Sequence, residues 1–147
     1  MRTVSVPNEY LLTEVSSLLS DGNIVTLKAK GHSMLPFIVG DRDNVVLQKK
    51  EIYAVRDIVL AEVDSKHFVL HRIINIEKNK ITLMGDGNIA GTERCNINDI
   101  RGYAVSIVRK GKTINCNSKS ESYKAYLWQK LLPFRRYLLA IYKRIII

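Results

Sequence analysis

The sequence has little cysteine, with only Cys95 and Cys116 among 147 residues. Two cysteines do not make the disulfide framework that holds many small secreted domains together. They are also not accompanied by a second cysteine pair or a histidine cluster at the spacing of zinc ligands. We therefore interpret both as ordinary thiols and expect no metal site.

Long apolar runs are also absent. Residues 1–7 contain one arginine and no apolar stretch of the length that a secretory signal needs. No segment reaches the roughly 18 uncharged apolar residues that cross a bilayer. We expect a cytoplasmic protein with no signal peptide and no transmembrane span.

Acidic residues are scarce at the C-terminal end. The net charge is +9, and residues 119–147 contain seven basic residues but a single acid, Glu121. Most of the positive excess therefore lies in the last fifth of the chain, and a segment this basic suits nucleic acid or an anionic membrane surface. The remaining composition, 46% hydrophobic and 25% charged, is typical of one globular domain with a real core.

The first periodic segment predicts a helix. Residues 8–20 repeat leucine and valine at helical spacing, Asn8 is placed to cap the helix, and Gly22 is placed to stop it. We predict a short amphipathic helix packed on the core. It is too short for a DNA-binding helix-turn-helix.

From residue 23 onward the apolar period becomes two, which indicates strands. Turn-forming residues at 64–67 and 78–80 predict hairpins, so His71 falls on the central strand of a three-stranded meander. The fold class is therefore mainly β, a coiled and partly closed antiparallel β-barrel. The predicted strands cover residues 24–30, 44–48, 58–63, 68–76, 81–84 and 103–108.

The C-terminal segment predicts a basic amphipathic helix. Residues 110–122 are polar and lead out of the β domain, and residues 123–147 mix apolar and aromatic side chains with basic ones. Pro133 should kink or divide this helix. Such a helix suits a membrane surface. It equally suits a protein surface, which could be the barrel itself or a second subunit. We expect no nucleic acid, because the barrel carries no basic stripe. The predicted division is 1–22 for the N-terminal helix, 23–115 for the β domain, and 116–147 for the linker and basic helix.

One stretch holds a candidate nucleophile. Residues 31–36 read GHSMLP and are followed by Gly-Asp at 40–41, which places Ser33 in a turn beside flexible Gly31. A serine hydroxyl becomes a useful nucleophile only with a base in hydrogen-bond reach and donors for the oxyanion. By itself, the stretch is better explained as an ordinary Gly/Pro turn.

Two later motifs change this interpretation. The apolar run 68–74 contains His-Arg at 71–72, and Gly-Asp-Gly-Asn follows at 85–88. Together with the Ser33 motif, this ordered series resembles the type I signal peptidase superfamily, which includes the LexA-like self-cleaving proteins. The resemblance covers residues 25–112. A histidine where most bacterial relatives carry lysine resembles the endoplasmic-reticulum, archaeal and sporulation-type branch.

The resemblance implies a role for each site residue. Ser33 would be the nucleophile, His71 the general base, and Asp86 the acid that orients His71, with Glu93 as a weaker substitute. The oxyanion and substrate-binding positions would be Gly31, Met34 and Pro36. On residues alone, His71 is better explained as a core histidine bound to a backbone carbonyl, and Asp86 also fits an ordinary turn.

The expected function is therefore a serine endopeptidase that forms an acyl-enzyme without any cofactor. Its expected partner is an extended peptide with small residues near the cleaved bond, a preference that the resemblance implies. The basic segment 123–147 leads us to expect a peripheral location at the inner membrane face. The alternatives are self-cleavage, or an inactive module that binds a peptide or a partner protein. The sequence leaves the oligomeric state undetermined.

Overall fold

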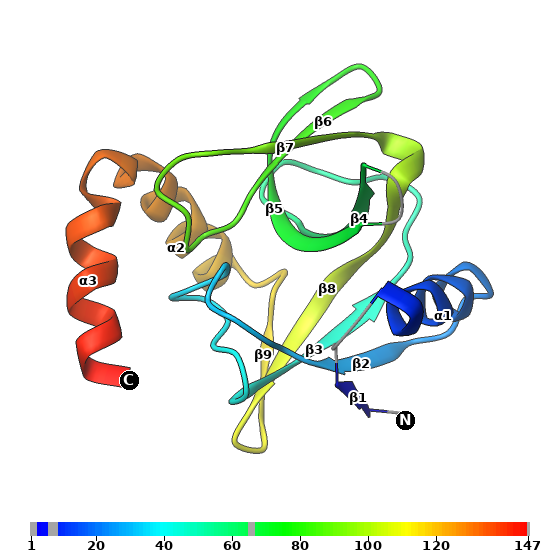
Figure 1. The fold of residues 1–147 in the computed structure, drawn as a ribbon, viewed down its shortest axis with the longest axis horizontal. Helices are drawn as coiled ribbons and strands as arrows, with labels where there is room; N and C mark the ends of the chain where they lie inside the picture. The colour runs from blue at the N-terminus through cyan, green and yellow to red at the C-terminus, as the bar shows by residue number, and fades with distance from the viewer. Residues whose placement is uncertain (1–2, 6–8, 65–66, 147) are drawn as a thin grey trace.

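The computed structural model describes residues 3–5, 9–64 and 67–146 as a curled β-sheet with one helix between its first two strands and two helices after its last strand (Figure 1). This confirms the mainly β, partly closed antiparallel architecture. The helices are α1 (Glu9–Ser20), α2 (Lys119–Lys130) and α3 (Arg135–Ile146), with single 3-10 turns η1 (Ile97–Asp99) and η2 (Leu132–Phe134). The strands are β1 (Thr3–Ser5), β2 (Val25–Lys28), β3 (Asp43–Gln48), β4 (Ile58–Val63), β5 (His67–Glu77), β6 (Lys80–Met84), β7 (Glu93–Asn96), β8 (Ile100–Arg109) and β9 (Lys112–Asn115).

The sheet order is β1-β2-β3-β8-β4-β5-β6-β7, with β9 paired to β8. Among the strands of the described residues, only the β1–β2 pair is parallel. The register shifts within the β3–β8, β4–β8 and β5–β6 pairs, and such irregularities increase the local twist that curls a sheet. Strand β5 lies between β4 and β6, which confirms the predicted meander with His71 on its central strand.

Strands β1, β7 and β9 were not predicted. Residues 110–122 do not simply lead out of the domain, because β9 folds back on β8 through Lys110 and Gly111. Both turn residues have positive φ, 51° and 81°, as a two-residue hairpin turn of the primed type requires.

Helix α1 ends where its sequence predicted, since the Gly22 N–H bonds to the Leu19 carbonyl and Gly22 has a φ of 91°. Its apolar side chains, among them Leu12, Val15 and Leu19, are buried in the core, where the helix packs on β2, β5 and β8. The predicted N-cap, Asn8, lies outside the described residues, as does the tip of the 64–67 hairpin at residues 65–66.

Pro133 divides the C-terminal segment into two helices, as predicted, with η2 between them. Both helices bury side chains against the barrel: Trp128 of α2 and Leu139 of α3 form an apolar cluster with Leu35. Helices α1 and α3 lie at opposite ends of the molecule (Figure 1). Within the described ranges, no helix has the length and apolar character needed to cross a membrane.

A buried carboxylate stabilises the first turn of the barrel. Asp43 is completely buried and accepts hydrogen bonds from Arg42, Arg109 and the Val39 N–H, at 2.8 to 3.2 Å. Burial alone would raise the pKa of Asp43, but the bonds from Arg42 and Arg109 outweigh it and lower this pKa below its ordinary value. The carboxylate is thereby held ionised between β3 and β8.

Candidate active site

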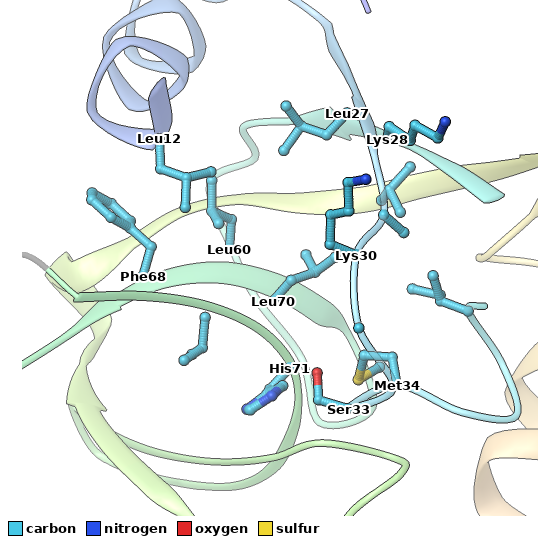
Figure 2. Close-up of a pocket in the computed structure, with 15 residues that line it drawn as sticks. Leu12, Leu27, Lys28, Lys30, Ser33, Met34, Leu60, Phe68, Leu70 and His71 are labelled. Atoms are coloured by element: carbon cyan, nitrogen blue, oxygen red, sulfur yellow. The ribbon is translucent and has the colours of Figure 1, made fainter. Parts of the chain in front are cut away.

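Ser33 and His71 line one pocket, although they come from separate segments of the chain (Figure 2). The pocket has a volume of about 290 Å³ and lies between residues 27–34 and the first half of β5. Ser33 is exposed on a turn, whereas His71 is buried on β5. The structure thus brings the predicted nucleophile and the predicted base together.

The turn that carries Ser33 is tightly built. Gly31 has a φ of 77°, which favours glycine, and the Asp41 N–H bonds back to the Ala29 carbonyl at 2.8 Å. Lys30 pairs with Asp41 at 2.6 Å, and this hydrogen bond lowers the pKa of the Asp41 carboxyl. These contacts close the loop, while Met34 is buried and anchors its far side.

The Gly-Asp-Gly-Asn loop packs directly on the serine segment. The Gly87 N–H donates to the Ser33 carbonyl at 2.8 Å. A Cβ on Gly85 would collide with that carbonyl and stand 3.1 Å from His71 Nε2, and a Cβ on Gly87 would collide with the His32 carbonyl. Both positions therefore require glycine, because the backbone around Ser33 passes so close to them.

Glu93 is the acidic partner of His71. Its Oε1 lies 2.6 Å from His71 Nδ1. A carboxylate only accepts hydrogen bonds, so in the neutral imidazole this contact selects the tautomer in which Nδ1 carries the proton and Nε2 presents a lone pair. Nε2 lies on the side of Gly85 and the Ser33 backbone, which is the orientation that a base for Ser33 needs.

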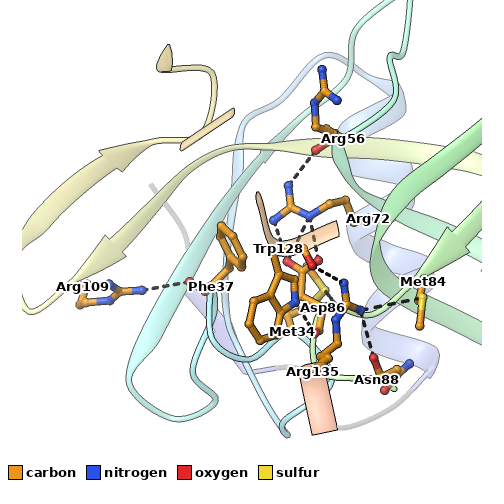
Figure 3. Close-up of polar contacts among 10 residues, drawn as sticks. All are labelled: Met34, Phe37, Arg56, Arg72, Met84, Asp86, Asn88, Arg109, Trp128 and Arg135. Carbon is orange, nitrogen blue, oxygen red and sulfur yellow. Dashed lines mark hydrogen bonds and ion pairs between the residues drawn. The ribbon is translucent and has the colours of Figure 1, made fainter. Parts of the chain in front are cut away.

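The expectation that Asp86 orients His71 is corrected by this geometry. Asp86 is buried and binds Arg72 through both carboxylate oxygens, with the shortest distance 2.6 Å (Figure 3). Neighbouring residues of a strand point to opposite faces, so the group that pairs with Arg72 is turned away from His71. Asp86 instead fixes its loop, where its N–H contacts Met34 Sδ and its carbonyl accepts from Trp128 Nε1 at 2.8 Å.

Of the three predicted oxyanion or substrate positions, two line the pocket and one does not. Gly31 and Met34 line the pocket. Pro36 does not; it lines a separate hollow beside α2, together with Trp128 and Leu131. Over the described ranges, the Ser33 N–H makes no hydrogen bond with the rest of the chain, so it is available as a donor.

The pocket wall is mostly apolar. It is lined by side chains of α1, β2, β3, β4 and β5, with the cationic Lys28 and Lys30 also on its lining (Figure 2). The other two histidines, His32 and His67, are not among the lining residues. Such a pocket accepts an apolar side chain of a bound ligand.

The cysteines lie elsewhere. Burial raises the pKa of both the Cys95 and the Cys116 thiol to about 11, so the reactive thiolate is scarce at neutral pH. In the described part of the chain, no three His, Cys, Asp or Glu side chains are grouped as they would be to hold a metal ion.

Sequence reasoning missed two residues that support the site, Trp128 and Arg135. Arg135 is buried, donates to the Asn88 carbonyl at 3.0 Å, and stacks on Trp128 (Figure 3). Desolvation lowers the pKa of its guanidinium. No local pattern shows that residues of the C-terminal helices reach the 85–88 loop. The one signal in the sequence was that Trp128 is the single tryptophan of the chain.

A family model described as Peptidase S24-like matches residues 2–107. This span includes Ser33, His71 and Glu93, and ends before α2 and α3. No curated protein matches the chain.

Proposed function

Since this chain belongs to the Peptidase S24-like family, a family of serine peptidases, we propose that it is an active serine endopeptidase whose catalytic residues are Ser33, His71 and Glu93. The observation that carries the proposal is the shared pocket of Ser33 and His71, with Glu93 on the far ring nitrogen. A histidine base also supports placement in the Ser-His branch of the wider signal-peptidase-like superfamily.

The chemistry follows from these positions. Ser33 Oγ attacks the carbonyl carbon of a peptide bond while His71 Nε2 takes the hydroxyl proton. Glu93 holds the imidazole and stabilises the imidazolium that forms. The Ser33 N–H donates to the oxyanion, and His71 returns its proton to the amine as the C–N bond breaks. Water then hydrolyses the acyl-enzyme by the same proton route, which restores Ser33.

The substrate we propose is an extended peptide that lays an apolar side chain into the pocket next to Ser33. The apolar lining contributed by Leu12, Leu60 and Phe68 supports this choice. The preference for small residues at the cleaved bond, which the resemblance implies, stays a prediction.

A peptide library tests the proposal. Wild type and Ser33→Ala are incubated with the library, with Ser17→Ala as matched control because Ser17 is an exposed serine on α1. We expect cleavage products by mass spectrometry from wild type and Ser17→Ala, and none from Ser33→Ala. Cleavage of its own chain alone would indicate an autolytic protein. Complete inertness of wild type would favour a binding module and contradict the proposal.

A further inference from the structure

Helix α3 is fixed on the barrel by one face only. Arg135 and Leu139 are buried, and Tyr142 and Ile146 are partly buried on the same side, next to the cluster that contains Leu35. These positions recur every three or four residues, so they form a single stripe along the helix. The buried stripe sets the orientation of α3 and so determines which of its side chains face the solvent.

Part of that solvent side is an apolar stripe. Tyr137, Ile141 and Ile145 follow one another at four-residue spacing and are 65%, 59% and 76% exposed. Leu138 and Phe134, the last residue of η2 just before α3, extend the same stripe, and we name these five residues the outer face of α3. Soluble monomers rarely leave so continuous an apolar stripe in water, which marks an interaction surface.

The surroundings of the outer face are cationic. Arg136, Lys143 and Arg144 are exposed on α3, and no acidic residue occurs after Glu121, which itself pairs with Lys124 at 3.0 Å. A second copy of this chain would bring like charges together across a two-fold interface. Charge complementarity therefore favours an anionic occupant over self-association.

We propose that the outer face of α3 docks on an anionic lipid bilayer, with the helix lying in the plane of the interface. Its 12 residues span about 18 Å, short of the roughly 30 Å hydrocarbon core, so α3 lies on the membrane and does not cross it. Aromatic and isoleucine side chains enter the headgroup boundary, while arginine and lysine contact lipid phosphates. This surface is distinct from the proposed peptidase site and independent of proteolysis.

Vesicle flotation tests the proposal with the full chain. Vesicles of phosphatidylcholine alone are compared with vesicles containing one third phosphatidylglycerol, at low and high salt. The variant is Ile141→Ser/Ile145→Ser, and the control is Ile52→Ser, because Ile52 is an isoleucine 81% exposed on a loop remote from α3 in sequence. Circular dichroism checks that all three proteins are folded.

We expect wild type and Ile52→Ser to float with anionic vesicles and to bind phosphatidylcholine at least tenfold more weakly. The double variant should bind anionic vesicles at least tenfold more weakly, and high salt should weaken wild-type binding. Equal flotation of the double variant, or no flotation of wild type, would overturn the proposal. A dimer in solution that the double variant abolishes would assign the face to a second copy and overturn it as well.

Discussion

His71 and Arg72 are neighbours on β5, and each has its own carboxylate on its own face of the strand. Glu93 contacts His71 at 2.6 Å on the pocket side. Asp86 contacts Arg72 at 2.6 Å on the other side, where both side chains are buried. We infer that the first pair serves proton transfer, and that the second holds the 85–88 loop in place.

Exchanging each carboxylate for its amide separates the two roles. Glu93→Gln should lower kcat about 10²–10⁴-fold with little change in Tm, because the amide no longer stabilises the imidazolium. Asp86→Asn should reduce the free energy of unfolding by about 3–5 kcal/mol, because it leaves the buried Arg72 without its counter-charge. Peptide turnover and thermal unfolding of both variants measure whether each substitution affects kcat or stability. Full turnover by Glu93→Gln, or an unchanged Tm in Asp86→Asn, would contradict the assignment.

At the scale of elements, the 85–88 loop connects the β-sheet to the C-terminal helices. The Gly87 N–H contacts the Ser33 carbonyl, Trp128 donates to the Asp86 carbonyl, and Arg135 donates to the Asn88 carbonyl (Figure 3). Helices α2 and α3 thus support the loop against which the nucleophile turn is packed, although the family match ends at residue 107.

Trp128→Phe tests this support. It keeps an aromatic ring in the cluster but leaves the buried Asp86 carbonyl without its donor, which should cost about 1–3 kcal/mol of unfolding free energy. Turnover should also fall, because the loop that positions Ser33 loses a contact. Chemical denaturation and kcat are measured beside Tyr123→Phe, a control on the exposed side of α2. Identical behaviour of the two variants would show that α2 does not support the loop.

Prediction from sequence succeeded where the signal is local and failed where it depends on distant contacts. Alternating apolar residues predicted β2 to β6 and β8, and the motifs around Ser33 and His71 predicted the shared pocket. Strand β7 has exposed residues alternating with partly buried ones and no apolar run, so it was missed, and with it the position of Glu93 beside His71. The choice between Asp86 and Glu93 depends on which face of β5 each carboxylate meets, which spacing alone does not reveal. The apolar pattern of the C-terminal helix likewise did not separate its buried stripe from its exposed one.

At the scale of the whole molecule, the two ends differ in character. Helix α1 completes the core at one end of the molecule. Helix α3 lies at the other end, with the sheet between them, and presents its apolar outer face flanked by basic side chains (Figure 1). The arginine pair on Asp43 ties the start of β3 to the end of β8. The stability of the whole fold should therefore depend on the charge of Asp43.

Acid unfolding should report on that charge. Because the folded-state pKa of Asp43 lies below its unfolded value of about 3.9, the unfolded chain binds more protons in this window, and stability falls as the pH drops through it. Above the unfolded pKa the contribution is fully present. Asp43→Asn should be less stable at pH 7 and lose less stability on acidification to pH 3 than wild type. Urea unfolding at several pH values measures this, and parallel pH profiles of the two proteins would refute it.

The central claim is that His71 activates Ser33, and labelling with a fluorophosphonate tests it most directly because it needs no knowledge of the substrate. Ser33 Oγ displaces fluoride from phosphorus, and mass spectrometry of the digested protein locates the adduct. We predict an adduct on Ser33 in wild type and in His32→Ala, and labelling slowed at least about 10²-fold in His71→Ala. Absence of the adduct from folded wild type, or equal labelling rates in His71→Ala and wild type, would contradict the account.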